Sequence, residues 1–312
     1  MARAMRVDLR SRYRGALLGL AVGDALGTTV EFKPAGSFPP VRDMIGGGPF
    51  GLAPGEWTDD TSMALCLAES LVECRGFDAA DQMRRYVRWW RHGHLSSTGR
   101  CFDVGNTVRT ALSEFERTGN PFSGPTARHT AGNGSLMRLA PVPLCFASSP
   151  ADALEHAAAS SRTTHGAPEA VDACRVLAAL IVGALRGLPK DELLSPTFVD
   201  SASLAPGVAA VVGGSYKTLE PPRIRGTGYV VDSLEAALWA FHRTASFEEG
   251  ALKAVNLGDD ADTTGAVYGQ LAGTFYGADG IPERWVSRLA CRATIEDFAQ
   301  RVLQLATSNA SS

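Results

Sequence analysis

Two apolar segments of the sequence carry a glycine at every fourth position. The two sets are Gly15, Gly19 and Gly23 near one end of the chain, and Gly265, Gly269 and Gly273 near the other. Glycine at this spacing lines one face of a helix and lets a neighbouring backbone approach closely. Because glycine also lowers helix propensity, we expect close packing to compensate for that loss. The pattern predicts two buried central helices, one over Arg12–Gly27 and one opening near Asp262.

The rest of the chain favours an all-α fold in a single compact domain over residues 1–312, with a core over about 12–306. No repeat with a period of about 20 to 50 residues occurs, and no alternating β pattern extends beyond Gly228–Asp232. A hydrophobic content of 45% in 312 residues suffices for a sizeable core. Further helices are predicted over 62–75, 78–91, 108–117, 168–185, 208–212, 232–241, 282–290 and 294–305, with a loop over 33–56 and a frayed tail over 307–312.

The charge and the cysteine content of the chain limit which binding partners and which cellular compartment are expected. A net charge of −3 and a pI near 6.1 argue against general binding to nucleic acid or anionic membranes. The six cysteines form no CxxC pair and lie mostly in apolar segments, which is typical of reduced cysteines in a cytoplasmic protein. The basic N-terminus lacks the apolar run of a signal peptide, and no membrane span is visible. Since there is no heptad or exposed apolar strip, we expect a monomer.

The second glycine-lined helix follows an acidic run, residues 256–265, which holds three carboxylates and two hydroxyls. Asp262 is predicted as the N-cap of this helix, with Thr263 in its first turn. Asp260 and Asp262 are two residues apart, a spacing at which an irregular turn can bring both onto one ion. The simpler interpretation is an ordinary cap with extra surface acids.

A second run of the same design, residues 57–62, leads into the apolar helix over 62–75. Hard divalent cations take oxygen ligands, and Mg²⁺ or Mn²⁺ sites are built from carboxylates, hydroxyls and waters. Two such helix starts facing each other would form a site for two cations, and their joint occurrence favours this interpretation over two separate caps. The predicted metal ligands are Thr58, Asp59, Asp60, Asp260, Asp262 and Thr263.

Other polar residues stand in unusual places. Asp24 and Glu31 are acids in or just after an apolar helix, where Glu31 could also be a solvated loop residue. Asp103 lies in a small-residue loop, 96–107, before a predicted helix; such loops expose backbone N–H groups that suit phosphates, and Asp103 could equally be a simple N-cap. The turn 130–135 is a tight glycine turn by itself.

At these residues the chain resembles the ADP-ribosylglycohydrolase family. The matching segments are 15–27, Thr58-Asp59-Asp60, 132–138 (Gly-Asn-Gly-Ser-Leu-Met-Arg), Thr164-His165-Gly166 and Asp260-Ala261-Asp262-Thr263. Each motif is weak alone, but five in order, reaching from residue 15 to about 277, are specific. The resemblance implies the all-α fold, a site for two divalent cations, Mg²⁺ or Mn²⁺, and glycosidic-bond hydrolysis.

The resemblance also implies roles for individual residues. Glu31 would position or deprotonate the attacking water, Asp103 would face the guanidinium of a substrate arginine, and Asp60 and Asp262 would take part in catalysis as metal ligands. His165 would lie in the nucleotide pocket, where a local hydrogen-bonding role is the alternative, and Tyr229 would stack on adenine rather than serve the core. The full set expected to bind ADP-ribose is Gly99, Gly105, Asn106, Gly132, Asn133, Gly134, Ser135, His165 and Tyr229.

We therefore predict a metal-dependent hydrolase that removes ADP-ribose from arginine on a protein. One alternative is a hydrolase of other conjugates: serine-linked ADP-ribose, O-acetyl-ADP-ribose or a modified nucleobase. Another is a relative that binds ADP-ribose without catalysis, although the intact acids argue against it.

Overall fold

The computed structural model describes residues 7–309, and these fold into one helical domain without a β-strand beyond two isolated bridges. The helices are α1 (Leu9–Gly27), α2 (Asp59–Glu73), α3 (Ala79–His92), α4 (Asn106–Thr118), α5 (Pro141–Cys145), α6 (Pro150–Thr164), α7 (Pro168–Leu185), α8 (Lys190–Leu193), α9 (Pro206–Val212), α10 (Val230–Arg243), α11 (Phe247–Val255), α12 (Ala261–Tyr276), α13 (Glu283–Val286) and α14 (Arg292–Asn309). Short 3₁₀ turns η1 to η4 connect some of them.

The two glycine-lined helices, α1 and α12, pack against each other at the centre of the domain. They run antiparallel, because Gly19 lies opposite Gly269 and Gly23 opposite Gly265. A Cβ added at Gly269 would stand 2.0 Å from the carbonyl oxygen of Gly19, so the two backbones are in direct contact. The prediction of two buried central helices is thus confirmed, and each glycine stripe supplies the close neighbour that the other requires.

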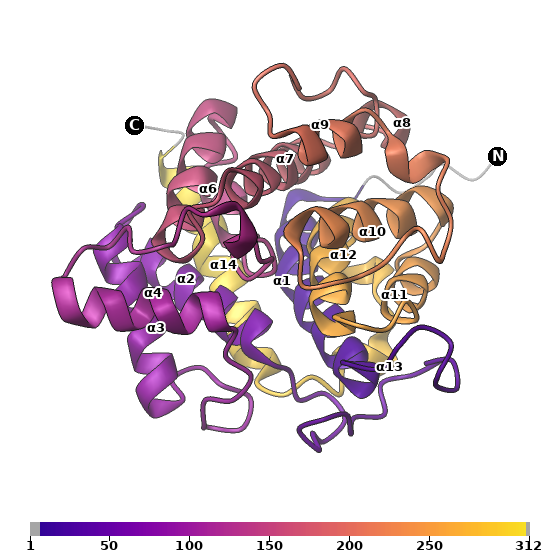
Figure 1. The fold of residues 1–312 in the computed structure, drawn as a ribbon, viewed down its shortest axis with the longest axis horizontal. Coiled ribbons are helices and arrows are strands. Elements are labelled where there is room, and N and C mark those ends of the chain that lie inside the picture. The colour runs from indigo at the N-terminus through magenta and orange to yellow at the C-terminus, as the bar shows by residue number, and fades with distance from the viewer. Residues whose placement is uncertain (1–6, 310–312) are drawn as a thin grey trace.

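The remaining helices surround this pair. Figure 1 shows α3 and α4 on one side of it and α10 and α11 on the other, with α7 and α6 above. α7, α10, α11 and α14 each contact α1 or α12 directly. The all-α class predicted from the sequence is confirmed, and the long loop between η1 and α2 is present as expected.

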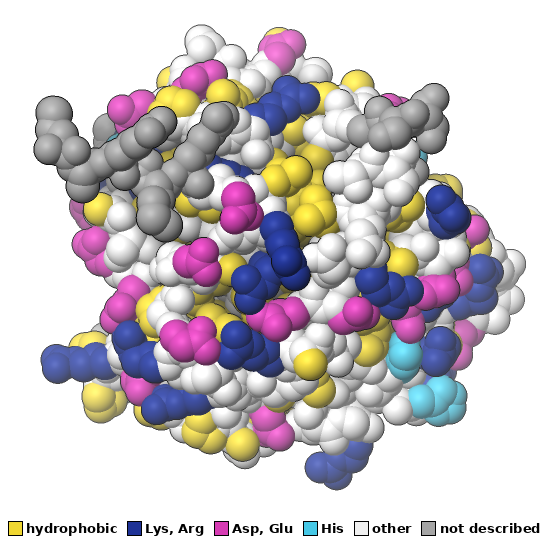
Figure 2. Space-filling model, turned by 180° about the vertical axis from the view of Figure 1, so that it is seen from behind, with side chains coloured by type: hydrophobic (Ala, Val, Ile, Leu, Met, Phe, Trp, Pro, Cys, Tyr) yellow, Lys and Arg dark blue, Asp and Glu magenta, His cyan; other side chains and the backbone are white. Residues whose placement is uncertain are grey.

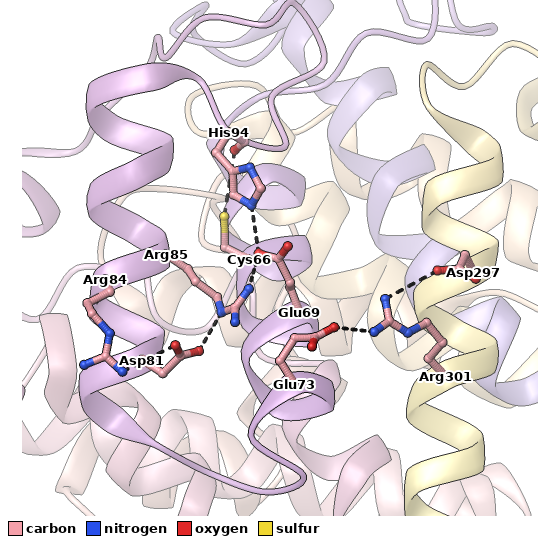
Figure 3. Close-up of polar contacts among 9 residues, drawn as sticks. All are labelled: Cys66, Glu69, Glu73, Asp81, Arg84, Arg85, His94, Asp297 and Arg301. Carbon is pink, nitrogen blue, oxygen red and sulfur yellow. Dashed lines mark hydrogen bonds and ion pairs between the residues drawn. The ribbon is translucent and has the colours of Figure 1, made fainter.

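A polar network fixes α2, the helix that begins at the second acidic run. Figure 3 shows Glu69 of α2 between Arg85 of α3 and His94, while Glu73 pairs with Arg301 of α14. The contact from His94 Nε2 to Glu69 is 2.7 Å. Both ion pairs lie toward the C-terminal end of α2 and connect it to α3 and α14.

Several predicted boundaries are wrong in detail. The N-cap of α12 is Asp260, with Asp262 in the first turn. The helix predicted over 282–290 is the single turn α13, because Pro282 opens it and the chain turns again at Ser287. α14 continues to Asn309, so the start of the predicted tail is helical, and residues 1–6 and 310–312 lie outside the described part. The sequence patterns also do not predict α5, α6, α8 and α11.

The surface on the side away from the viewer of Figure 1 is evenly charged. Figure 2 shows basic and acidic side chains interspersed there, without an extended patch of one sign. Within residues 7–309, no helix combines the length and the apolar character needed to cross a bilayer. The six cysteines are all unpaired.

Candidate active site

Three chain segments that carry acids meet at one end of the central helix pair. Because α1 and α12 are antiparallel, the C-terminus of α1 lies beside the N-terminus of α12: a Cβ at Gly27 would stand 2.4 Å from Cα of Asp262. After α1, the turn η1 (Thr28–Val30) leads directly to Glu31. The N-terminus of α2, with Thr58 as N-cap, lies against Asp24 of α1. The two acidic runs predicted to face each other therefore do so.

Asp24 holds the start of α2 in place. Its Oδ1 accepts hydrogen bonds from the backbone N and Oγ1 of Thr58, both at 2.9 Å. Its Oδ2 accepts from the backbone N and Oγ1 of Thr61, at 3.1 and 2.6 Å. Burial raises the pKa of Asp24 to about 6, against these donors, which lower it. Asp24 is unusual in the sequence, as an acid within a glycine-lined helix, but it is not among the predicted site residues.

The hydroxyl of Thr58 lies among three carboxylates. Its Oγ1 is 2.9 Å from Asp24, 3.0 Å from Asp60 and 3.1 Å from Asp262. A hydroxyl has one proton and can donate to one of them only. The other two contacts bring oxygen lone pairs together, an arrangement that a bound cation or added protons would relieve.

Two groups of carboxylates have ligand atoms close enough to share a metal ion. One contains Asp24, Asp60 and Asp262, and the other Glu31, Asp103 and Asp262; within each group the atoms lie within 4.8 Å of one another. Oδ1 of Asp60 and Oε2 of Glu31 are buried without a hydrogen-bond partner. Unpartnered buried acceptors of this kind fit cation ligands.

Electrostatics in the metal-free site favour protonated acids. Burial and the nearby charges of Asp103, Asp260, Asp60 and Asp24 raise the pKa of Glu31 to about 10. The pKa values of Asp59, Asp60 and Asp262 are also raised, first by burial and then by neighbouring carboxylates. These are the shifts expected where like charges converge in a buried site.

Asp103 belongs to this cluster and does not cap a helix. The N-cap of α4 is Gly105, so the interpretation of Asp103 as a simple N-cap is wrong. Its backbone adopts a left-handed conformation, with φ at 52°, which is uncommon for a non-glycine residue. Burial, followed by the charges of Asp260 and Asp24, raises the pKa of Asp103 to about 7.

The acids open into a pocket of about 470 Å³. Its lining combines acids with residues of glycine-containing turns. Its lining includes Glu31, Asp59, Asp103, Gly105, Asn106, Gly132, Asn133, Gly134, His165, Asp260, Asp262 and Thr263. A second pocket of about 710 Å³ contains Tyr229, which is 38% exposed, and shares Thr107, Gly132 and Gly228 with the first. Most of the predicted site residues are thus brought to one continuous cleft.

Two predicted binding residues lie elsewhere. Oγ of Ser135 is 2.9 Å from Oγ of Ser161 in the interior, and Ser135 does not line the pocket. Gly99 is outside the pocket lining as well, in a loop whose carbonyl approaches Gly93. Asn133 lines the pocket, but its amide nitrogen donates to Asp260 at 2.8 Å, so it also positions an acid.

The fold and the site define an all-α protein with a metal-competent acidic cluster beside glycine turns. The sequence profile of the ADP-ribosylglycohydrolases matches residues 5–311, and the chain belongs to that family. It is 48% identical over 295 residues, 95% of this chain and 78% of the relative, to ADP-ribosylarginine hydrolase Tri1 of Pseudomonas putida. It is 35% identical to the ADP-ribosyl-[dinitrogen reductase] glycohydrolase of Rhodospirillum rubrum, covering 90% of this chain and 91% of that protein.

A solved structure described as an ADP-ribosylglycohydrolase-related protein complex has the same fold. The TM-score is 0.87 at 50% sequence identity, and the match covers 96% of this chain and 99% of the other. Both the family resemblance and the fold class expected from the sequence are therefore confirmed.

Proposed function

We propose that the protein hydrolyses the N-glycosidic bond between ADP-ribose and an arginine side chain of a protein. The observation that carries the proposal is the position of Asp103, whose carboxylate lies within 4.8 Å of Glu31 and Asp262 at the acidic end of the cleft. A carboxylate can hold a guanidinium by two parallel charge-assisted hydrogen bonds. The identity to proteins named ADP-ribosylarginine hydrolase supports the same substrate.

The acidic cluster fits two divalent cations, and we propose Mg²⁺ or Mn²⁺. The residues that would hold them are Thr58, Asp59, Asp60, Asp260, Asp262 and Thr263. Bound cations would neutralise these acids, hold the ribose hydroxyls and increase the acidity of the attacking water. The unpartnered oxygen of Asp60 and the crowded hydroxyl of Thr58 support this assignment.

Glu31 and Asp103 have separate roles in the cleavage of the glycosidic bond. Once the charges of the neighbouring carboxylates are offset, Glu31 is ionised, and its unpartnered Oε2 takes the proton of the water that attacks the anomeric carbon. The C1–N bond of the guanidinium form breaks through an oxocarbenium-like transition state, and its electron pair goes to the nitrogen, so the leaving group is a neutral guanidine. That guanidine takes up one proton, which balances the proton lost by the attacking water. Asp103 faces the guanidinium before and after the cleavage.

The glycine-lined part of the cleft binds the rest of ADP-ribose in this proposal. Backbone N–H groups near Gly105 and Gly132–Gly134 suit the diphosphate. Tyr229, at the far pocket, stacks on the adenine ring. Tyr229 lines the second pocket, which shares Thr107, Gly132 and Gly228 with the pocket that contains the acids, and this adjacency supports the same direction of binding. We also propose that the protein acts in the cytoplasm, where its unpaired cysteines would stay reduced, and that it is a monomer.

The proposal is tested by incubating the protein, with Mn²⁺ or Mg²⁺, with three substrates of defined linkage. These are ADP-ribosyl-arginine on a protein, ADP-ribosyl-serine on a peptide, and O-acetyl-ADP-ribose. Release of ADP-ribose from the arginine linkage at a kcat/KM well above the other two is the expected result. A preference for either of the other substrates would contradict the arginine assignment, and no release from any of them would contradict hydrolysis.

Replacing Asp103 separates the leaving group from the rest of the site. Asp103→Ala should reduce kcat/KM on arginine-linked substrate by about 100-fold, the order lost when a charged partner is removed from a buried ion pair. Activity on O-acetyl-ADP-ribose and affinity for ADP-ribose should change far less, because neither involves a guanidinium. Equal losses on both substrates would show that Asp103 serves the metal cluster as a whole.

Removing the metal should change how stability depends on pH. Without metal, Glu31 and Asp103 have folded pKa values of about 10 and about 7, above those of the unfolded chain. The folded state then binds more protons than the unfolded one, so the melting temperature in EDTA should fall as pH rises from 5 to 8.

With Mn²⁺ the slope should reverse, because protons compete with the ion for the carboxylates at low pH. Metal that binds only the folded state adds about 2.7 kcal/mol at a concentration a hundredfold above Kd. Thermal melts in EDTA and in Mn²⁺ across this pH range measure both slopes. Superimposable curves under the two conditions would rule out a metal site in this cluster.

A further inference from the structure

Arg138 is a buried cation without a carboxylate partner. It is 0% exposed, and among the described residues no acid forms an ion pair with it. Nη1 donates to the carbonyl of Gly134 at 2.7 Å, Nη2 donates to Oγ1 of Thr164 at 2.6 Å, and the guanidinium lies over the ring of Tyr86. Burying a charge is costly unless it is well bonded. Its two shortest contacts are to Gly134, which lines the cleft, and to Thr164, which immediately precedes the lining residue His165.

The contact with Thr164 constrains the neighbouring histidine. Oγ1 of Thr164 is 2.8 Å from Nδ1 of His165. A guanidinium can only donate, so Thr164 accepts from Arg138 and directs its single proton elsewhere. Among the described residues, Nδ1 of His165 is the one other hydrogen-bond partner of this hydroxyl. Nδ1 therefore accepts, and in a neutral ring the proton must sit on Nε2.

His165 has the burial that keeps its ring neutral. Burial and the charge of Arg138 lower the pKa of His165 to about 3. The ring is 2% exposed, lines the cleft, and its Nε2 has no hydrogen-bond partner within the described part of the chain. Its Nε2 edge packs on glycine: a Cβ at Gly134 would stand 2.8 Å from Cε1, and one at Gly132 would stand 3.4 Å from Nε2.

We propose that Arg138 is a positioning residue which, through Thr164, fixes His165 as the Nε2–H tautomer, so that His165 donates to an acceptor oxygen of the bound nucleotide. The ring then offers a donor and no lone pair to the cleft, which selects for a phosphate or other acceptor oxygen at this point. The identity of the ligand as ADP-ribose rests on the proposed function; the tautomer does not.

The tautomer is measured by NMR on protein labelled with ¹⁵N-histidine, where protonated and bare ring nitrogens have well separated shifts. His165→Gln identifies the signals among the six histidines. In the wild-type protein we expect Nδ1 bare and Nε2 protonated. Protonation on Nδ1 would overturn the proposal.

A matched pair of variants tests whether the hydroxyl of Thr164 links Arg138 to His165. Thr164→Val has nearly the same shape without the hydroxyl, whereas Thr164→Ser keeps it. Thr164→Val should give a mixture of tautomers and about tenfold weaker ADP-ribose binding by calorimetry, the order of one lost hydrogen bond. Thr164→Ser should keep the wild-type tautomer and bind within about twofold of wild type. Wild-type shifts and affinity in Thr164→Val would overturn the proposal.

Arg138→Met tests whether Arg138 fixes the tautomer of His165, and a thermal melt checks that the variant is folded. The variant should lose the single tautomer as Thr164→Val does; an unchanged tautomer in a folded variant would overturn the role of Arg138. If the variant does not fold, the threonine pair decides. If His165 has the expected tautomer but the protein does not cleave the arginine linkage, the proposed function is wrong and the tautomer proposal stands.

Discussion

Turnover by Asp262→Asn is expected to fall by at least about 1,000-fold, because a metal ion contributes several kcal/mol to the transition state and each 1.36 kcal/mol is a factor of ten. Among the described residues, Asp262 alone belongs to both groups of carboxylates that could share a metal. Asparagine keeps the size of the side chain and an oxygen that can accept from the backbone N of Thr263, which Asp262 now does at 2.8 Å. The helix start should therefore survive.

The same change should stabilise the metal-free protein near pH 7. Burial and the charges of Glu31, Asp60, Asp260 and Asp103 raise the pKa of Asp262, so the carboxylate is unfavourable there without a cation. An uncharged amide removes that repulsion.

Steady-state rates, calorimetric titration with Mn²⁺ and melts in EDTA measure the effects of Asp262→Asn. Asp152→Asn is the matched control, since Asp152 is an exposed acid in the first turn of α6. Wild-type turnover and metal binding in Asp262→Asn would contradict the metal assignment.

Gly269→Ala is expected to destabilise the protein severely, although it adds only one methyl group. The new Cβ would lie 2.0 Å from the carbonyl oxygen of Gly19, and neither partner is a side chain that can rotate away. The central helices must separate, which opens the best-packed part of the core. We expect a loss of more than about 4 kcal/mol, in the range of severe core disruption, and a melting temperature lower by at least about 10 °C.

The control for this variant is another glycine-to-alanine change. At Gly105, φ is −58° and an added Cβ meets nothing within 4 Å. Gly105→Ala should therefore melt within a few degrees of wild type, because alanine restricts the unfolded chain without a clash. Thermal melts of both variants in Mn²⁺ make the comparison. Similar melting temperatures for the two would show that α1 and α12 can separate without cost.

The central elements of the fold could be predicted from the sequence because their patterns are local. Glycine at every fourth position predicts a thin helix face, and the structure has such faces on α1 and α12. The contact between these two faces could not be predicted, because neither glycine pattern identifies the helix against which it packs. α6 escaped prediction for another reason: its buried positions are mostly alanine, serine and threonine, so its apolar stripe is faint.

The residues of the site were also predictable only in part. The acidic runs at the starts of α2 and α12 identify the carboxylates, since clustered acids before apolar helices are visible in the sequence. The role of Asp24 depends on a contact across 34 residues with Thr58, which only the packed structure reveals. Ser135 was predicted as a binding residue because it belongs to the glycine turn. Its side chain instead lies in the interior, against Ser161.

The backbone contact between α1 and α12 bears on ion choice. With no side chains between the helices to be compressed, the spacing between Asp24 of α1 and Asp262 of α12 is set by the peptide groups themselves. Mg²⁺ binds oxygen at about 2.0–2.1 Å and Ca²⁺ at about 2.3–2.6 Å. Ions of different radius need different spacings between their carboxylate ligands, and the main chains of the two helices resist a change in that spacing. The protein should therefore discriminate between divalent cations by radius, through the stiffness of its two central helices.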